Sequence, residues 1–157
     1  MAKNLKNSTG HIILMPFKVK EDVAIADVAF EATGKSLNEL FESCADAVVA
    51  TMVKDVKTVA AKKKKTIKLS SNKVDQLLHD FMNELIFLKD AELLLFSKCK
   101  VKVTEKAGAY NLFAECSGDK INMKTQELLV DVKAATWHMF EVEKTTKGWK
   151  AFVILDV

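Results

Sequence analysis

The stretch that decides the fold is GWKAFVILDV, residues 148–157, in which the side chains alternate as in a β-strand. Phe152 and Ile154 fall on one face, and the other face carries Trp149, Ala151, Val153, Leu155 and Val157. Because both faces are apolar, we expect this strand to lie inside a sheet.

Asp156 follows this apolar run, and an ionised carboxylate in such a place needs a partner, because unpaired buried charge is costly. The α-carboxylate of Val157 is one residue away, so two anionic groups can be held close together. Such groups repel each other unless a cation lies between them. The alternative is that the end of the strand frays, so that the Asp156 carboxylate is solvated by water.

A second strand is predicted at residues 25–33 (IADVAFEAT), where small apolar side chains alternate until Gly34 ends the pattern. Asp27 lies within this strand, although aspartate is depleted in strands. Carboxylates are hard oxygen donors, which suit Ca²⁺, Mg²⁺ or Mn²⁺ better than soft metals. Asp27, Asp156 and the Val157 carboxylate are therefore the candidate metal ligands.

Two amphipathic helices are predicted. Ser36 and Glu39 form a capping box that begins the first helix, which should end before or near Val59. Its buried stripe is Leu37, Leu40, Phe41, Cys44, Ala47, Val48, Thr51 and Met52, and its exposed residues are Glu39, Glu42, Asp46 and Lys54.

The second helix is predicted to begin at Ser71 or Asn72. His79 lies off its apolar stripe and is expected to be exposed. The stripe itself contains Val74, Leu77, Leu78, Phe81, Leu85 and Leu88.

The rest of the chain has the pattern of antiparallel strands. We expect an edge strand at residues 12–17, strands at 93–103 and 110–116 with a turn at 117–119, a longer strand region at 128–142, and a hairpin turn at 144–148. The predicted fold is α+β, with two amphipathic helices packed on antiparallel sheets. Residues 1–157 are predicted to form a single domain, with residues 1–10 as a mobile tail.

The overall charge excludes a protein that holds nucleic acid by phosphate neutralisation alone, because 24 cationic residues nearly balance 21 acidic ones. The most basic stretch, Lys62 to Lys65, could contact RNA phosphates or an acidic partner. A solvated loop or an exposed strand edge is the favoured interpretation of this run.

The cysteines, Cys44, Cys99 and Cys116, share no metal-binding spacing and lie in apolar patterns, which indicates reduced core thiols and a cytosolic protein. No segment has the length of a signal peptide core or a membrane span. Neither a glycine-rich phosphate loop nor a GxSxG motif is present. A nucleophilic cysteine paired with His138 stays open, although buried thiols fit the pattern better.

Three blocks of sequence follow one another in an order that can be compared with known families. Residues 26–52 (ADVAFEATGKSLNELFESCADAVVATM) place an aspartate in a short strand before a glycine turn and a capped helix. Residues 75–97 (DQLLHDFMNELIFLKDAELLLFS) follow as a helix and a strand, and VKAATWHMFEV with GWKAFVILDV forms a closing hairpin with a penultimate aspartate. Together they resemble the archease family, and the resemblance covers residues 17–157.

This resemblance implies a small cytoplasmic accessory protein that activates the RtcB-type RNA ligase of tRNA splicing and RNA repair. It implies that the protein promotes guanylylation and multiple turnover of the ligase, which supplies the chemistry, so the protein itself is not an enzyme. It also implies a divalent metal ion, Ca²⁺ or else Mn²⁺ or Mg²⁺, bound by Asp27, Asp156 and Val157. Contact with RNA would be indirect or weak, and no membrane partner is expected.

The chain departs from the family pattern at one position. The family usually has His-Thr-Ala-Asp before the helix, whereas this chain has Ala24-Ile25-Ala26-Asp27, so a histidine that would support the metal or touch the ligase is absent. Lys133 and His138 lie within the closing-hairpin motif. They are candidates for contacting the ligase or ordering the site, and packing roles are equally open.

Two other functions stay open. A tRNA-binding chaperone that modulates a tRNA-modifying enzyme would use the Lys62 to Lys65 run and the lysines at 98, 100 and 102. A metal-dependent hydrolase would use the same carboxylates around an activated water, but the sequence offers no separate general acid or base for it.

Overall fold

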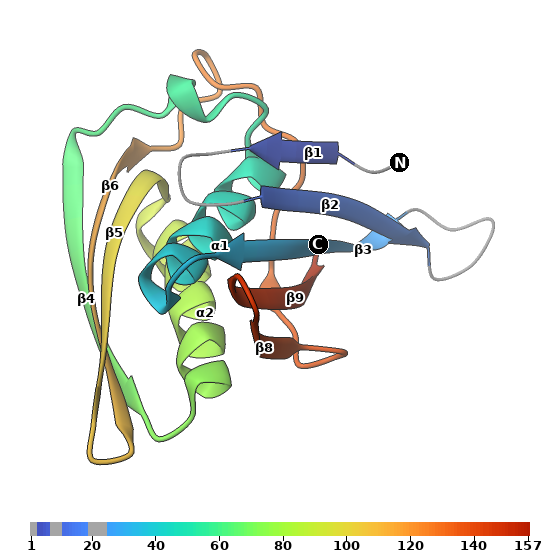
Figure 1. Cartoon of the computed structure of the whole chain (residues 1–157). Coiled ribbons are helices and arrows are strands. Elements are labelled where there is room, and N and C mark those ends of the chain that lie inside the picture. Colours follow the sequence, from blue (N-terminus) through green and yellow to red (C-terminus); the bar gives the residue numbers. More distant parts are fainter. Residues whose placement is uncertain (1–2, 7–10, 19–24) are drawn as a thin grey trace.

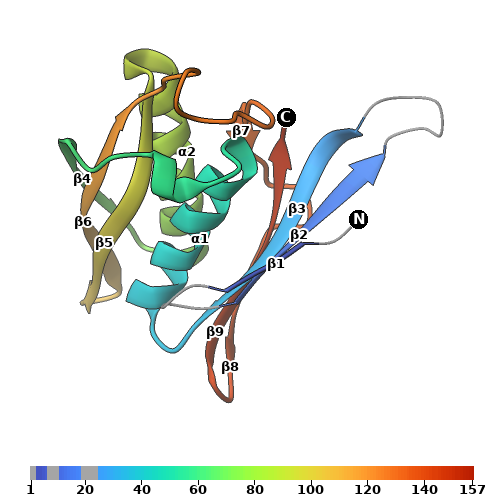
Figure 2. The ribbon, with the colours of Figure 1, turned by 90° about the horizontal axis from the view of Figure 1, so that it is seen from above.

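Two helices lie between two antiparallel sheets in the structure, which is a computed structural model that describes residues 3–6, 11–18 and 25–157 and the side chains from residue 27 onward. The helices are α1 (Leu37–Met52) and α2 (Val74–Glu92). Seen from above, they form a middle layer with one sheet on each side (Figure 2). The architecture is α+β, as the sequence predicts.

The larger sheet contains the C-terminal strand (Figure 1). Its order is β1 (Lys3–Lys6), β2 (His11–Lys18), β3 (Ile25–Gly34), β9 (Gly148–Asp156) and β7 (Ala134–Ala135), and β8 (Glu141–Thr145) also pairs with β9. Because β9 has partners on both sides, the prediction of an internal terminal strand is confirmed. Ala151, Val153 and Leu155 point into the core from it.

The smaller sheet has the order β4 (Lys63–Ser71), β6 (Ala109–Lys120) and β5 (Leu94–Lys106). Side chains of α1 cover the open edge of β5. The backbone N–H of Val101 donates to Glu42 Oε2 at 2.9 Å, and that of Val103 donates to Asn38 Oδ1 at 2.8 Å. These bonds satisfy edge donors that would otherwise be free to pair with another chain.

Helix α1 begins as predicted, because Ser36 Oγ accepts from the N–H of Glu39 at 3.2 Å and Glu39 Oε2 accepts from the N–H of Lys35 at 2.8 Å. It ends at Met52, ahead of a 3₁₀ turn at Val56–Thr58. Of the four residues predicted to be exposed, Lys54 is exposed, whereas Glu39, Glu42 and Asp46 are half-buried. The helix packs against both sheets, so little of its surface remains in water.

Helix α2 has the predicted apolar stripe but a different start. Its N-cap is Lys73, without a side-chain cap, and Ser71 is the last residue of β4. Ser71 Oγ instead accepts from the N–H of Lys73 at 3.2 Å, which shapes the turn between strand and helix. Leu93, with a φ of 55°, ends the helix in the left-handed region.

Several strand predictions are corrected by the sheet pairing. The predicted edge strand at 12–17 is internal, because β2 pairs with β1 on one side and with β3 on the other. Within the predicted mobile tail, residues 1–10, the structure describes Lys3–Lys6 as β1, and residues 1–2 and 7–10 lie outside the described ones. Residues 117–119 are no turn, since β6 continues to Lys120. Gly118 allows this, because a Cβ there would collide with the Leu95 carbonyl group.

The predicted strand region at 128–142 is mostly irregular and contains only the short β7 and the start of β8. A buried lysine replaces strand pairing as the anchor of this segment. Lys89 Nζ lies 2.6 Å from Asp131 Oδ1, 2.6 Å from Asp90 Oδ1 and 2.7 Å from the carbonyl oxygen of Val132. Burial lowers the pKa of Lys89, but the hydrogen bonds to Asp131 and Asp90 outweigh it and hold that pKa above its usual range.

The expectation of three reduced thiols is wrong for two of them. Cys99 and Cys116 are opposite each other across β5 and β6, and the structure pairs them as a disulfide. Cys44 is a free buried thiol, and burial together with the nearby Asp46 charge raises its pKa. In the described part of the chain, no helix is long and apolar enough to cross a membrane.

Candidate metal centre

Two aspartates face each other across the pair formed by β3 and β9. Asp27 is directly opposite Asp156 in the antiparallel register, and both are half-buried. Directly opposed residues point to the same face of a sheet, with Cβ atoms about 4.5–5.5 Å apart. The structure therefore brings together two carboxylates that are 129 positions apart in the sequence, by 156 minus 27.

The apolar alternation of β9 sets this register. Val153 and Leu155 are fully buried on the core side, so Asp156 belongs to the opposite, outer face of the sheet. The pairing runs without a shift from Gly34 and Trp149 to Asp27 and Asp156. A slip by one residue would turn Ala151, Val153 and Leu155 away from the core and Asp156 into it.

A third segment completes the surroundings of the aspartates. Ala134 of β7 is opposite Asp156 on the other side of β9, and the N–H of Lys133 donates to the backbone oxygen of Asp156 at 2.8 Å. Val157 follows at once, and its half-buried side chain packs against the core. Asp27, Asp156, Val157 and the backbone of Lys133 thus meet at one end of the larger sheet.

The other predicted residues are placed differently. The Lys133 side chain is exposed. His138 is exposed on the segment between β7 and β8, and no hydrogen bond or ion pair within residues 27–157 links it to the two aspartates. Ala24, which stands where the family has histidine, lies outside the described residues.

The donor set fits a hard divalent cation. The two facing aspartates supply oxygen ligands only, as Ca²⁺, Mg²⁺ and Mn²⁺ prefer. Among the described residues, no three His, Cys, Asp or Glu side chains group together as ligands.

Sequence reasoning missed the side chains that hold β7 next to Asp156. The N–H of Ala135 donates to Asn83 Oδ1 at 3.0 Å, and Asn83 Nδ2 donates to the Ala135 carbonyl oxygen at 3.2 Å. Asn83 belongs to α2, so it fixes the short strand to the helix layer. No local pattern signals this role, because the two residues are 52 positions apart.

His79 is another correction, since it is half-buried rather than exposed. Its ring stacks on Trp137 with the ring centroids 3.7 Å apart, and Phe140 meets both rings edge-on. Burial lowers the pKa of His79, against smaller opposing effects of the Asp80 charge and of a hydrogen bond with Ala135. These rings hold the segment from β7 to β8 against α2.

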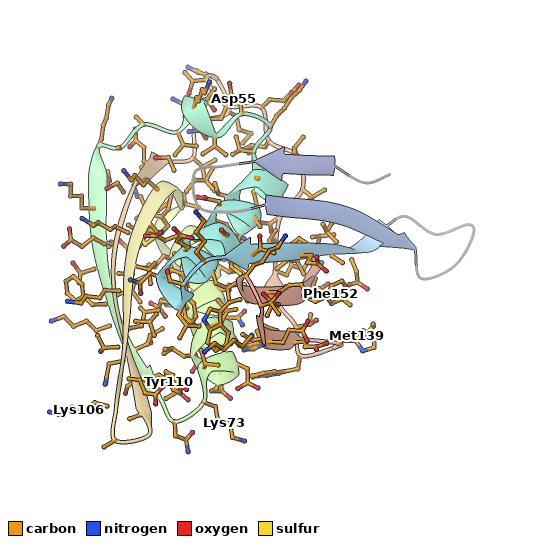
Figure 3. The ribbon with its side chains drawn as sticks, viewed as in Figure 1. Asp55, Lys73, Lys106, Tyr110, Met139 and Phe152 are labelled. Carbon is orange, nitrogen blue, oxygen red and sulfur yellow. A yellow bond between two sulfur atoms is a disulfide. The ribbon has the colours of Figure 1, made fainter. Side chains whose placement is uncertain are left out.

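A hollow of about 610 Å³ opens on the outer face of the same sheet. It is lined by Glu31, Met139, Phe140, Glu141, Glu143, Lys150 and Phe152. Three carboxylates against one lysine make it acidic, and Met139 is 62% exposed at its rim. Figure 3 shows Phe152 and Met139 on the same side of the molecule.

Comparison with known proteins identifies relatives along most of the chain. The model of the "Archease protein family (MTH1598/TM1083)" matches residues 17–157. The chain is 38% identical over 132 residues to the protein archease of Methanothermobacter thermautotrophicus, which covers 84% of this chain and 93% of that relative. It is 32% identical over 133 residues to the protein archease of Methanosarcina barkeri, with 84% and 90% covered.

Solved structures agree. The solution structure of Methanobacterium thermoautotrophicum protein 1598 matches with a TM-score of 0.76 and 36% identity, over 92% of this chain and 98% of that one. The crystal structure of an archease from Thermotoga maritima, described as a possible chaperone, matches with a TM-score of 0.58 over 90% and 99% of the two chains. At 17% identity, this second likeness shows the fold alone.

Proposed function

Because this chain belongs to the archease family, we propose that it is a metal-binding accessory protein that activates an RtcB-type RNA ligase in the cytoplasm. The observation that supports the proposal most directly is the pairing of Asp27 with Asp156 beside the C-terminal residue. These are the three residues in which the family resemblance places a metal ion.

Asp27, Asp156 and Val157 would hold the cation, which is Ca²⁺, Mn²⁺ or Mg²⁺ by its ligand chemistry. The bound cation would add positive charge to an otherwise acidic end of the sheet. The protein's part is to hold the two carboxylates rigidly: the inner face of β9 is anchored in the core, and Lys133 and Asn83 tie β7 in place beside it.

The surface around this end supports a protein partner. Trp137 is 51% exposed and Met139 is 62% exposed, and both lie on the segment that the His79 and Phe140 rings hold in place. Exposed aromatic and methionine side chains are enriched at protein interfaces. Lys133 and His138 are exposed on the same connecting region and are proposed to contact the ligase.

The ligase would supply the chemistry, and this protein would promote its guanylylation and turnover. The direct test adds the protein to an RtcB-type ligase of the same organism and measures RNA joining over multiple turnovers with GTP and Mn²⁺. Turnover should rise in the presence of the protein. Unchanged turnover at saturating concentrations of both proteins would reject the proposal.

Replacing Asp27 tests the metal centre itself. Asp27→Ala should lose metal binding in a calorimetric titration with Ca²⁺ or Mn²⁺ and should lose ligase activation. Without metal, its melting temperature should hold or rise, because one of two facing like charges is removed.

Glu127→Ala is the matched control, since Glu127 is 64% exposed and pairs with Lys54 away from the two aspartates. It should bind metal and activate the ligase as the parent does. Equal metal affinity in Asp27→Ala and the parent would remove Asp27 from the site.

A further inference from the structure

The outer face of the smaller sheet gathers lysines from two distant segments. Its three strands present alternate residues to this face, and the exposed ones include Lys64 and Lys68 on β4 and Lys98, Lys100 and Lys102 on β5. We call these five residues the lysine face. Strand β6 lies between β4 and β5, so the lysines form two rows with one strand between them.

The positive charges of the lysine face outnumber the acidic side chains among them. Among the described residues, none of its five lysines forms an ion pair, whereas Lys65 of the same basic run pairs with Glu92 at 2.7 Å. Glu115 is the acidic residue that β6 adds between the two rows, opposite Lys100. The face therefore carries a local positive charge that the overall charge of +3 does not reveal.

An exposed aromatic ring lies between the rows. Phe113 of β6 is opposite Lys68 on one side and Lys102 on the other, and it is 41% exposed. Lys68 Nζ lies 5.7 Å from the centroid of this ring. An open hollow of about 730 Å³ surrounds it, lined by Lys68, Leu69, Ser70, Lys102, Thr104, Asn111, Leu112 and Phe113.

We propose that the lysine face and Phe113 bind single-stranded RNA. Lysines attract backbone phosphates, and an exposed ring between them offers a surface on which an unpaired base can stack. A single strand supplies both groups at once. A duplex hides the faces of its bases, and a peptide whose acidic side chains are aspartate and glutamate offers charge on groups that are not rings.

This surface is separate from the candidate metal centre. The helix layer of α1 and α2 stands between the two sheets, so the lysine face and the outer face of the larger sheet point to opposite sides of the molecule (Figure 2). RNA bound there would leave the aspartate end free for the ligase. The inference thus goes beyond the proposed function, under which RNA contact is indirect or weak.

Fluorescence anisotropy with a labelled single-stranded RNA of about 12 nucleotides tests the proposal, since known single-strand sites span about 4–16 nucleotides. The double variant Lys68→Glu, Lys102→Glu should weaken binding by about tenfold or more at moderate salt. Phe113→Leu, which keeps the charge, should weaken it by about fivefold or more through lost stacking. Both should melt near the parent temperature, since all three side chains are exposed.

The matched control is Lys124→Glu, Lys147→Glu, which makes the same charge change at exposed positions outside the lysine face. It should bind RNA within about twofold of the parent, since only charge close to the bound strand acts strongly at moderate salt. Asp27→Ala should also bind RNA normally, which separates this result from failure of the metal centre. Equal losses in control and lysine-face variants, unchanged binding by Phe113→Leu, or equal affinity for duplex RNA or an acidic peptide would overturn the proposal.

Discussion

At the scale of single residues, Asp46 shows how packing changes the chemistry of one carboxyl group. It lies half-buried on α1, where burial and then repulsion from Glu42 raise its pKa to about 6. In the unfolded chain the group has an ordinary pKa near 4. At neutral pH the folded protein therefore holds a charge whose burial lowers stability.

Replacing Asp46 with Asn should raise the free energy of unfolding by about 1–3 kcal/mol at pH 7.5. The substitution is expected to stabilise because the pKa of Asp46 is higher in the folded protein than in the unfolded chain. Ionisation of Asp46 destabilises the protein fully above about pH 6 and not at all well below pH 4, so the gain should vanish on acidification. Urea unfolding at pH 7.5 and pH 4 measures the gain in the free energy of unfolding, and Glu127→Gln is the control at an exposed position. Equal gains at both pH values would contradict the assignment.

At the scale of elements, strand β9 is the part that joins core and candidate site. Val153 and Leu155 on its inner face belong to the core, and Asp156 on its outer face is opposite Asp27. The strand is paired on both sides over its last residues. A rigid, doubly paired strand holds carboxylates more exactly in place than a loop would.

A short tag after Val157 tests the proposed role of the terminal carboxylate. The tag replaces that carboxylate with a neutral amide and moves the new terminus away by about 3.3 Å for each extended residue. The melting temperature without metal should stay close to that of the untagged protein. The rise in melting temperature on adding Ca²⁺ or Mn²⁺ should shrink, because this rise scales with metal concentration over Kd.

A tag of the same sequence at the N-terminus is the control, since it leaves the carboxylate of Val157 unchanged. It should preserve both the metal-dependent melting shift and ligase activation. Identical metal-dependent shifts for the two tagged proteins would exclude Val157 as a ligand.

At the scale of the whole molecule, stability depends on the helix layer that both sheets share. Leu40 of α1 and Phe81 of α2 are fully buried. Phe81 also stacks on Phe41 across the two helices, with ring centroids 5.9 Å apart. Truncating either side chain leaves a cavity in the middle layer, where neither sheet can easily collapse to fill it.

Leu40→Ala should lower the free energy of unfolding by about 2–5 kcal/mol and Phe81→Ala by about 3–5 kcal/mol. Both variants should still bind metal and activate the ligase below their melting temperatures, because neither residue lies at the aspartate end. Chemical denaturation with circular dichroism measures the loss. A variant that melted like the parent would show that the assigned helix faces are wrong.

The sequence by itself determined what depends on short-range periodicity. Strand β3, the Ser36 cap, the apolar stripe of α2, the hairpin from β8 to β9 and the α+β class follow from side-chain alternation, helical spacing and turn residues. The unusual places of Asp27 and Asp156 were also visible, because a charge in an apolar strand departs from a local pattern.

Only the tertiary structure decided what depends on contacts between remote segments. Glu42 and Asp46 are half-buried because α1 has a sheet on each side. Cys99 and Cys116 form a disulfide because the register of β5 and β6 places them opposite each other. The tertiary structure left residues 128–133 irregular, anchored by Lys89, and it placed two separate runs of lysines on one face. Periodicity specifies which side of an element is apolar, but burial and pairing depend on which other element packs there, and that choice is made by the whole chain.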